Sequence, residues 1–364
     1  MAISPPRRRF CGQCLALGAV VVAQSVPPVH AHAGNSRTRL VAAWNDAQGY
    51  KAGLIEIRTS GVQVTTEVEL PTRAHGLTPM PDGSVVIVAR RPGDWLMRWQ
   101  PHAPKRTLIR WAEPMQPLNG HALPHLEGGV ILTTETDALT DFGLVVMRDA
   151  KSLEPIRVWR SGGRDPHQML AAPGGRCIWV ANGGIASRHE AGRARVAGVE
   201  MDSSLVEMDA VSGAIVRRYT ADDPCLSLRH LSYHPASATL GIAMQAEHTH
   251  EAHRQSAPVL GLLRVAPGRR AECIEMAEAR SAMQGYGGSV LAVKDGFWVS
   301  SPRGDLAGFW SLDGQWRKKA HLPGVCALAL SPRGVLMGGK RLVLFAGTIF
   351  PLSMHPDNHW SLVA

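Results

Sequence analysis

The sequence predicts an all-β protein, a seven-bladed β-propeller. His75, His121 and His167 stand at an identical interval, each 46 residues after the last. Each follows a polar segment and precedes a short apolar run that ends in a proline or glycine turn. Repeats of 40 to 50 residues with four short strands each are typical of propellers. The 37 glycines and 25 prolines, without a long amphipathic helix, suit many short strands joined by turns.

The first 33 residues have the pattern of a cleaved export signal. A basic start at residues 7–10, Arg-Arg-Arg-Phe, precedes a short apolar stretch at residues 15–22 and the small-x-small site Ala31-His32-Ala33. The apolar stretch is too short to span a bilayer. The paired arginines followed by phenylalanine favour twin-arginine export, which predicts a periplasmic protein. Cys11 and Cys14, spaced like a redox or zinc pair, lie inside this signal.

Residues 34–364 are expected to form one β-propeller domain without a further membrane span. Loss of the signal removes three arginines and lowers the formal charge from +9 to +6. The basic residues are scattered and form no block with aromatic residues, so we expect no nucleic-acid partner. Four widely spaced cysteines remain, and the sequence leaves open whether they pair or stay as buried thiols: Cys177, Cys225, Cys273 and Cys326.

Each of the three evenly spaced histidines begins a blade of four expected strands. The expected strands are 75–79, 84–89, 95–99 and 107–111 in one blade; 122–125, 129–134, 143–148 and 156–159 in the next; and 168–172, 177–181, 204–208 and 214–219 in the third. Alternating apolar residues bounded by glycine, proline and polar turns justify each of them.

Three further blades follow, opened by His230, by Tyr286-Gly-Gly and by Val325-Cys326. Their expected strands are 239–245, 259–265 and 272–276; 289–293, 297–301, 308–312 and 316–322; and 327–330, 335–338 and 342–346. Two insertions, at 181–203 and 246–256, both follow a second strand. We therefore expect them on the same face of the ring, which is usually the binding face of a repeat protein.

The two ends of the chain complete one blade together. Residues 39–44, 53–57 and 64–70 have the pattern of second, third and fourth strands without a first. Residues 358–363 are a lone strand that begins with a histidine motif. Pairing this strand into the N-terminal blade closes the ring, removes its exposed edges and gives seven blades.

Eight short motifs occur in order along residues 39–363. They are Ala89-Arg-Arg-Pro-Gly93, Thr134-Glu-Thr-Asp137, Asp165-Pro-His167, Ala181-Asn-Gly-Gly-Ile185, Leu228-Arg-His-Leu231, Tyr286-Gly-Gly288, Ser301-Pro-Arg-Gly304 and Asp357-Asn-His359. Together they resemble the bacterial domain-of-unknown-function family numbered 1513. The resemblance implies a twin-arginine-exported periplasmic propeller, with imelysin-type and di-haem oxidoreductase-like proteins of iron-uptake gene clusters as partners. It implies no reaction and no catalytic residue.

Histidines near the start of the inner strands are the candidate metal ligands. In a propeller these positions surround the mouth of the central channel. Neutral imidazole is a common ligand of zinc, copper, iron and nickel. The alternative is structural, because such a histidine can also bond to a neighbouring blade and stabilise the ring. The candidates are His75, His121, His167, His230 and His359.

Four polar residues near these histidines, or after second strands, are candidates for binding an anionic cofactor. They are Arg73, Arg229, Asn182 and Glu135. Arginine holds carboxylate or phosphate with two parallel hydrogen bonds. Ion pairs between blades are the alternative, and for Glu135 and the nearby Asp165 they are the preferred interpretation.

A second possible metal site lies in the insertion after Ala246. His248, His250 and His253, with Glu247 and Glu251, have a spacing that allows weak chelation of a divalent metal ion. The alternative is a charged surface loop without a ligand.

The motifs of common enzymes do not occur in this sequence. It has no Gly-x-Ser-x-Gly elbow, no Walker loop, no His-Glu-x-x-His motif and no haem attachment site. The ring is rich in imidazole and poor in carboxylate, which argues against a calcium-dependent lactonase. We therefore expect a periplasmic binding or scaffold protein, more a carrier than an enzyme, that serves iron or other metal acquisition. The alternative is an oxidoreductase with a dissociable redox cofactor held by Arg73 and Arg229 in the channel.

Overall fold

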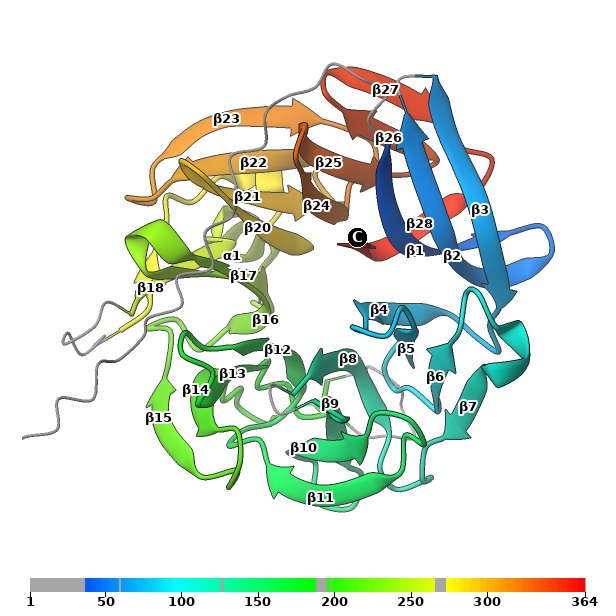
Figure 1. Cartoon of the computed structure of the whole chain (residues 1–364). Helices are drawn as coiled ribbons and strands as arrows, with labels where there is room; N and C mark the ends of the chain where they lie inside the picture. The colour runs from blue at the N-terminus through cyan, green and yellow to red at the C-terminus, as the bar shows by residue number, and fades with distance from the viewer. Residues whose placement is uncertain are drawn as a thin grey trace, which may run out of the picture. The chain divides into compact units, whose positions relative to one another are not determined.

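In the computed structural model, the chain forms a ring of seven four-stranded antiparallel sheets (Figure 1). The structure describes residues 37–58, 60–125, 128–187, 195–196, 198–265 and 273–363. The predicted export signal, residues 1–33, lies outside these ranges. None of the described helices has the length and apolar character needed to cross a membrane. The predicted seven-bladed propeller is confirmed.

The first blade contains both ends of the described chain. Its strands run in the order β28 (His355–Leu362), β1 (Thr38–Asp46), β2 (Gly49–Arg58) and β3 (Gly61–Glu69). Leu40 lies opposite Leu362, and Ala42 lies opposite Trp360. The predicted closure of the ring by the C-terminal strand is therefore confirmed, although this strand begins at His355 rather than at residue 358.

Blades 2, 3 and 4 follow the predicted order, each from an inner strand outward. Blade 2 contains β4 (Ala74–Pro79), β5 (Val85–Ala89), β6 (Trp95–Trp99), a 3-10 turn (Pro104–Arg106) and β7 (Leu108–Trp111). Blade 3 contains β8 (Leu118–Pro124), β9 (Val130–Asp137), β10 (Phe142–Asp149) and β11 (Pro155–Arg160). Blade 4 contains β12 (Pro166–Ala171), β13 (Cys177–Asn182), β14 (Ser204–Asp209) and β15 (Ile215–Tyr219).

Blades 5, 6 and 7 complete the ring. Blade 5 contains β16 (Leu226–His234), a 3-10 turn (Pro235–Ser237), β17 (Thr239–Ala246), α1 (Glu251–Ser256), β18 (Leu260–Arg264) and β19 (Glu275–Met276). Blade 6 contains β20 (Ser289–Val293), preceded by a 3-10 turn (Ser281–Met283), then β21 (Gly296–Ser301), β22 (Leu306–Ser311) and β23 (Trp316–His321). Blade 7 contains β24 (Ala327–Ser331), β25 (Gly334–Gly339), β26 (Leu342–Phe345) and β27 (Thr348–Pro351).

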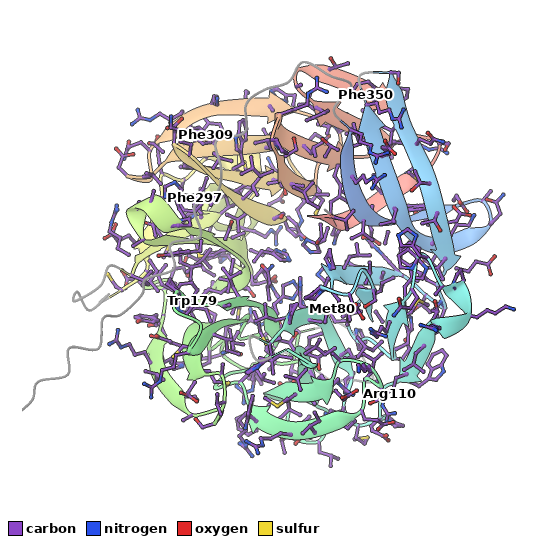
Figure 2. All side chains as sticks on the ribbon, viewed as in Figure 1. Met80, Arg110, Trp179, Phe297, Phe309 and Phe350 are labelled. Atoms are coloured by element: carbon purple, nitrogen blue, oxygen red, sulfur yellow. The ribbon has the colours of Figure 1, made fainter. Side chains whose placement is uncertain are left out.

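The hydrophobic core lies in layers between neighbouring blades. Trp179 and Phe297, labelled in Figure 2, belong to two of these layers and are buried. Leu40 of β1 and Trp360 of β28 share one layer with Phe345 of blade 7. Burial of one large apolar side chain contributes about 1.5–3 kcal/mol to stability. The closing strand is thus held by packing as well as by main-chain pairing.

Candidate metal centre

Five histidines from five consecutive blades meet in the channel. Each comes from the inner strand of its blade: His359 from β28, His75 from β4, His121 from β8, His167 from β12 and His230 from β16. Around this group, the ring centroids of neighbouring histidines are 4.6 to 4.7 Å apart. The last contact joins His230 to His359 and closes the circle. We call these five residues the histidine ring.

A local irregularity of the inner strand accompanies each of these histidines. The pairing register shifts between Ala74 and Leu77 in β4, between Leu118 and Ala122 in β8, and between Pro166 and Met169 in β12. Similar shifts lie beside His230 in β16 and within the pairing of β28 with β1. A β-bulge of this kind redirects a side chain out of the regular alternation. The bulges explain how polar imidazoles reach the channel from strands whose other residues face the core.

Three histidines of the ring, His75, His167 and His230, bond to one another through their Nε2 atoms. The Nε2 atom of His167 lies 3.4 Å from Nε2 of His75 and 3.1 Å from Nε2 of His230. Five buried ring nitrogens have no hydrogen-bond partner within the described ranges: Nδ1 of His75, His167 and His230, and Nε2 of His121 and His359. Buried polar groups without a partner are rare in proteins, so five in one place indicate a binding site.

The imidazoles are neutral at physiological pH. Burial lowers the pKa of His75, His121, His167 and His230 well below its usual value, and nearby imidazoles lower each of these pKa values further. Burial also lowers the pKa of His359 to about 4, although Asp357 opposes this shift. A neutral imidazole keeps a nitrogen lone pair for a metal ion. One nitrogen each of His75, His121, His230 and His359 lies within 4.8 Å of the others, a spacing suited to a shared ion.

Two carboxylates near the histidine ring in sequence, those of Asp165 and Asp357, are engaged by arginines. Arg229 is buried and donates to Asp165 across 2.7 Å, and Arg91 also pairs with Asp165. Arg73 binds Asp357 with two hydrogen bonds, of 2.7 and 2.6 Å. Since each of these carboxylates is engaged by arginine, the ligand set that faces the channel is made of imidazole. A small cavity beside the ring is lined by residues that include His75, His167, His230, Arg90, Arg91 and Arg229.

The other two predicted cofactor-binding residues have partners inside the blades. Glu135 is fully buried and accepts a 2.8 Å hydrogen bond from Arg148. The Asn182 side chain accepts from the Ser161 hydroxyl across 2.8 Å. Arg229 therefore lines the cavity beside the histidine ring and Arg73 is paired with Asp357, whereas Glu135 and Asn182 belong to internal hydrogen-bond networks. Their role in holding a cofactor stays a prediction.

The insertion after β17 is arranged differently from its predicted loop. It includes α1, and the His253 ring centroid is 6.4 Å from that of His248 and 5.7 Å from that of His250. The close ligand group formed by His248 includes Asp223 and Cys225 instead. Sequence reasoning missed this group because Asp223 and His248 are far apart along the chain. The pairing of β16 with β17 brings them together. The expected pairing of these two consecutive strands is the sequence signal that could have found this ligand group.

The fold and the ring define a seven-bladed propeller with a buried imidazole cluster in its channel. The chain belongs to the family described as "Protein of unknown function (DUF1513)", whose model matches residues 68–363. No curated protein matches the chain in a sequence search.

Solved structures are similar to this chain in fold. A chain of the structure titled "Kuenenia stuttgartiensis Hydrazine Synthase" superposes with a TM-score of 0.56 at 11% identity, over 85% of this chain and 94% of that one. A chain of the structure titled "Crystal structure of Nidogen/Laminin Complex" gives 0.51 at 13% identity, over 79% and 94%. At such identities the likeness shows the fold alone.

Proposed function

We propose that the histidine ring binds one transition-metal ion and that the protein is a carrier or scaffold for iron or another metal. The observation that carries this proposal is the convergence of five neutral imidazoles in a buried channel. Imidazole nitrogen suits iron, copper and zinc, whereas calcium and magnesium require oxygen ligands. The chemistry of the donor set therefore favours a transition metal.

The spacing of the ring nitrogens is consistent with coordination after a small movement. Nitrogens bound to one zinc ion at about 2.1 Å lie roughly 3–4 Å apart. In the ring, His75, His121, His230 and His359 each supply a nitrogen within 4.8 Å of the others. His167, which bonds to His75 and His230, supplies a fifth ligand or orients these two. The adjacent cavity leaves space for water or a small anion.

The same packing disfavours the predicted alternative, an oxidoreductase with a dissociable organic cofactor in the channel. Neighbouring imidazole centroids are 4.6 to 4.7 Å apart, so a flat quinone or haem has no gap between them. Arg73 and Arg229, predicted to hold such a cofactor, are paired with Asp357 and Asp165. These contacts support a bare ion over an organic group.

Metal analysis of the whole protein tests this function. We expect the protein purified from the periplasm to carry iron, copper or zinc, and the double variant His121→Ala/His230→Ala to carry about one equivalent less. His102→Ala, which changes an exposed histidine away from the channel, is the matched control. The proposal fails if none of the three metals binds above background and if deletion of the gene leaves growth under iron limitation unchanged.

We further propose export through the twin-arginine route and cooperation with imelysin-type and di-haem oxidoreductase-like proteins. The support is the Arg7-Arg8-Arg9-Phe10 motif and the family resemblance. Cell fractionation of the wild type and of an Arg8→Lys/Arg9→Lys variant tests the route. Wild-type protein that remains in the cytoplasm would contradict this export route. Co-purification from the periplasm tests the proposed partners.

A further inference from the structure

A second group of metal-ligating side chains lies at one end of blade 5. Asp223 and Cys225 precede β16, and His248 follows β17. These strands pair with Leu226 opposite Ala246, and the ladder extends outward because the Glu247 amide donates to the Cys225 carbonyl across 2.9 Å. The backbone that carries Cys225 and His248 is therefore held in place by the sheet.

The side chains of this group converge. The His248 Nε2 atom lies 2.9 Å from Asp223 Oδ2. The other carboxylate oxygen of Asp223 accepts the Cys225 amide across 2.9 Å, which orients the carboxylate. One ligand atom of each of the three residues lies within 4.8 Å of the other two. Cys225 has a free thiol, and His248 Nδ1 is buried without a hydrogen-bond partner in the described part of the chain.

We propose that Asp223, Cys225 and His248 form a second metal site, which binds a thiolate-preferring divalent ion such as zinc. Thiolate, imidazole and carboxylate are the three ligand types of protein zinc sites, and three protein ligands leave one position open. This proposal is independent of metal binding by the histidine ring.

The second site differs from the histidine ring in accessibility. The Asp223 side chain is 37% exposed and that of His248 is 17% exposed, whereas the histidines of the ring are buried or nearly so. Cys225 precedes His230 by five residues, a path of roughly 16 Å along an extended strand. An exchangeable ion at the outer position suits capture from solution, and the buried ring suits retention.

Cobalt(II) titration of the full-length protein separates the two sites. A thiolate bound to cobalt gives a near-ultraviolet charge-transfer band, which imidazole ligands do not give. We expect this band in the wild type and its loss in Cys225→Ser. It persists in Cys177→Ser, the matched control with another partly buried free thiol. It also persists in His121→Ala/His230→Ala, so failure of the histidine ring to bind metal leaves this test intact.

Weakening of the other two ligands completes the test. We expect His248→Gln and Asp223→Asn each to weaken cobalt binding at this site by at least about 10-fold, since even outer partners of ligands contribute this much. Thermal melting of each variant checks its folding. If one of the two variants fails to fold, the other still tests the proposal. Absence of the band in the wild type overturns the proposal. Its persistence in Cys225→Ser, or its loss in Cys326→Ser instead, also overturns it.

Discussion

Blades 1 to 5 and blades 6 and 7 have the same four-stranded form but differ at the channel. The first five direct a histidine inward, each beside a register shift of its inner strand. In blades 6 and 7, Gly288 and Cys326 precede β20 and β24, which pair with their neighbours without a shift in the described residues. Blades 6 and 7, which have no such histidine at the start of their inner strands, complete the propeller. These two blades therefore close without an imidazole in the channel, which supports the proposal of a functional role for the five.

A second contrast lies along the inner strands themselves. His125, just after β8, and His234, at the end of β16, bond through Nε2 to the carbonyls of Ala210 and Lys294, at 2.9 and 3.0 Å. These carbonyls belong to the neighbouring blades, so both histidines connect one blade to the next. In the histidine ring, by contrast, the imidazole of His167 bonds to those of His75 and His230. The chain thus contains histidines that connect neighbouring blades and histidines that meet in the channel. Substitutions can test the two groups separately.

The largest expected effect comes from the loss of the shared blade. Truncation after Phe350 removes β28, leaves the edge of β1 unpaired and exposes the layer that contains Trp360. A typical protein has a net stability of about 5–15 kcal/mol, so we expect the loss of several large buried side chains to prevent stable folding. We expect no soluble protein in the supernatant of a cell lysate. A truncated chain with unchanged solubility and melting would contradict closure through blade 1.

Next in size is the effect on metal affinity. His121→Ala/His230→Ala removes two of the proposed direct ligands, so we expect a loss larger than the roughly 10–100-fold that outer partners of metal ligands contribute. Folding should remain intact, since blades 6 and 7 close without such residues. Competition titration against a chromophoric chelator measures the affinity. Unchanged affinity, or an unfolded variant, would remove the distinction between the two groups of blades.

The stability of the metal-free protein should depend on pH through the histidine ring. Burial depresses the folded-state pKa of these histidines, so below about pH 6.5 the unfolded chain binds more protons than the folded one. Stability is therefore lost as the pH falls below about 6.5, and for His359 this loss continues to about pH 4. Urea denaturation at several pH values should show a smaller slope for His121→Ala/His230→Ala. An equal slope in both proteins would show that other groups dominate.

The smallest effect is expected at the far end of the inner strands. His234→Ala leaves the Lys294 carbonyl without its partner and removes the contact with Ser237, which costs about 1–3 kcal/mol. The metal content of the purified protein should stay at the wild-type level. Thermal melting and metal analysis of the same sample provide both values. A stable His234→Ala protein that has lost its metal would contradict the assignment of His234 to a structural contact between blades.

Some elements were predictable because their signals are local. The 46-residue interval and the apolar runs predicted the blades, and the incomplete first blade predicted its closure by the C-terminal strand. β27 was missed because its four residues, Thr348–Pro351, are mostly exposed and have no apolar alternation. The insertion after β17 was expected to be a loop, whereas it contains the short helix α1, which buries no residue and therefore has no amphipathic pattern.

By itself, the sequence determined the number of blades and the identity of the five channel histidines, because both follow from the order of the strands and from the residues that begin them along one chain. Only the tertiary structure decided that the imidazoles meet ring to ring at 4.6 to 4.7 Å, since each orientation depends on a bulge against a neighbouring strand. It also decided that His248 lies beside Asp223 and Cys225 rather than among the histidines of its own loop. Strand pairing joins distant residues through main-chain groups that are common to all amino acids, so side-chain patterns alone do not reveal such contacts.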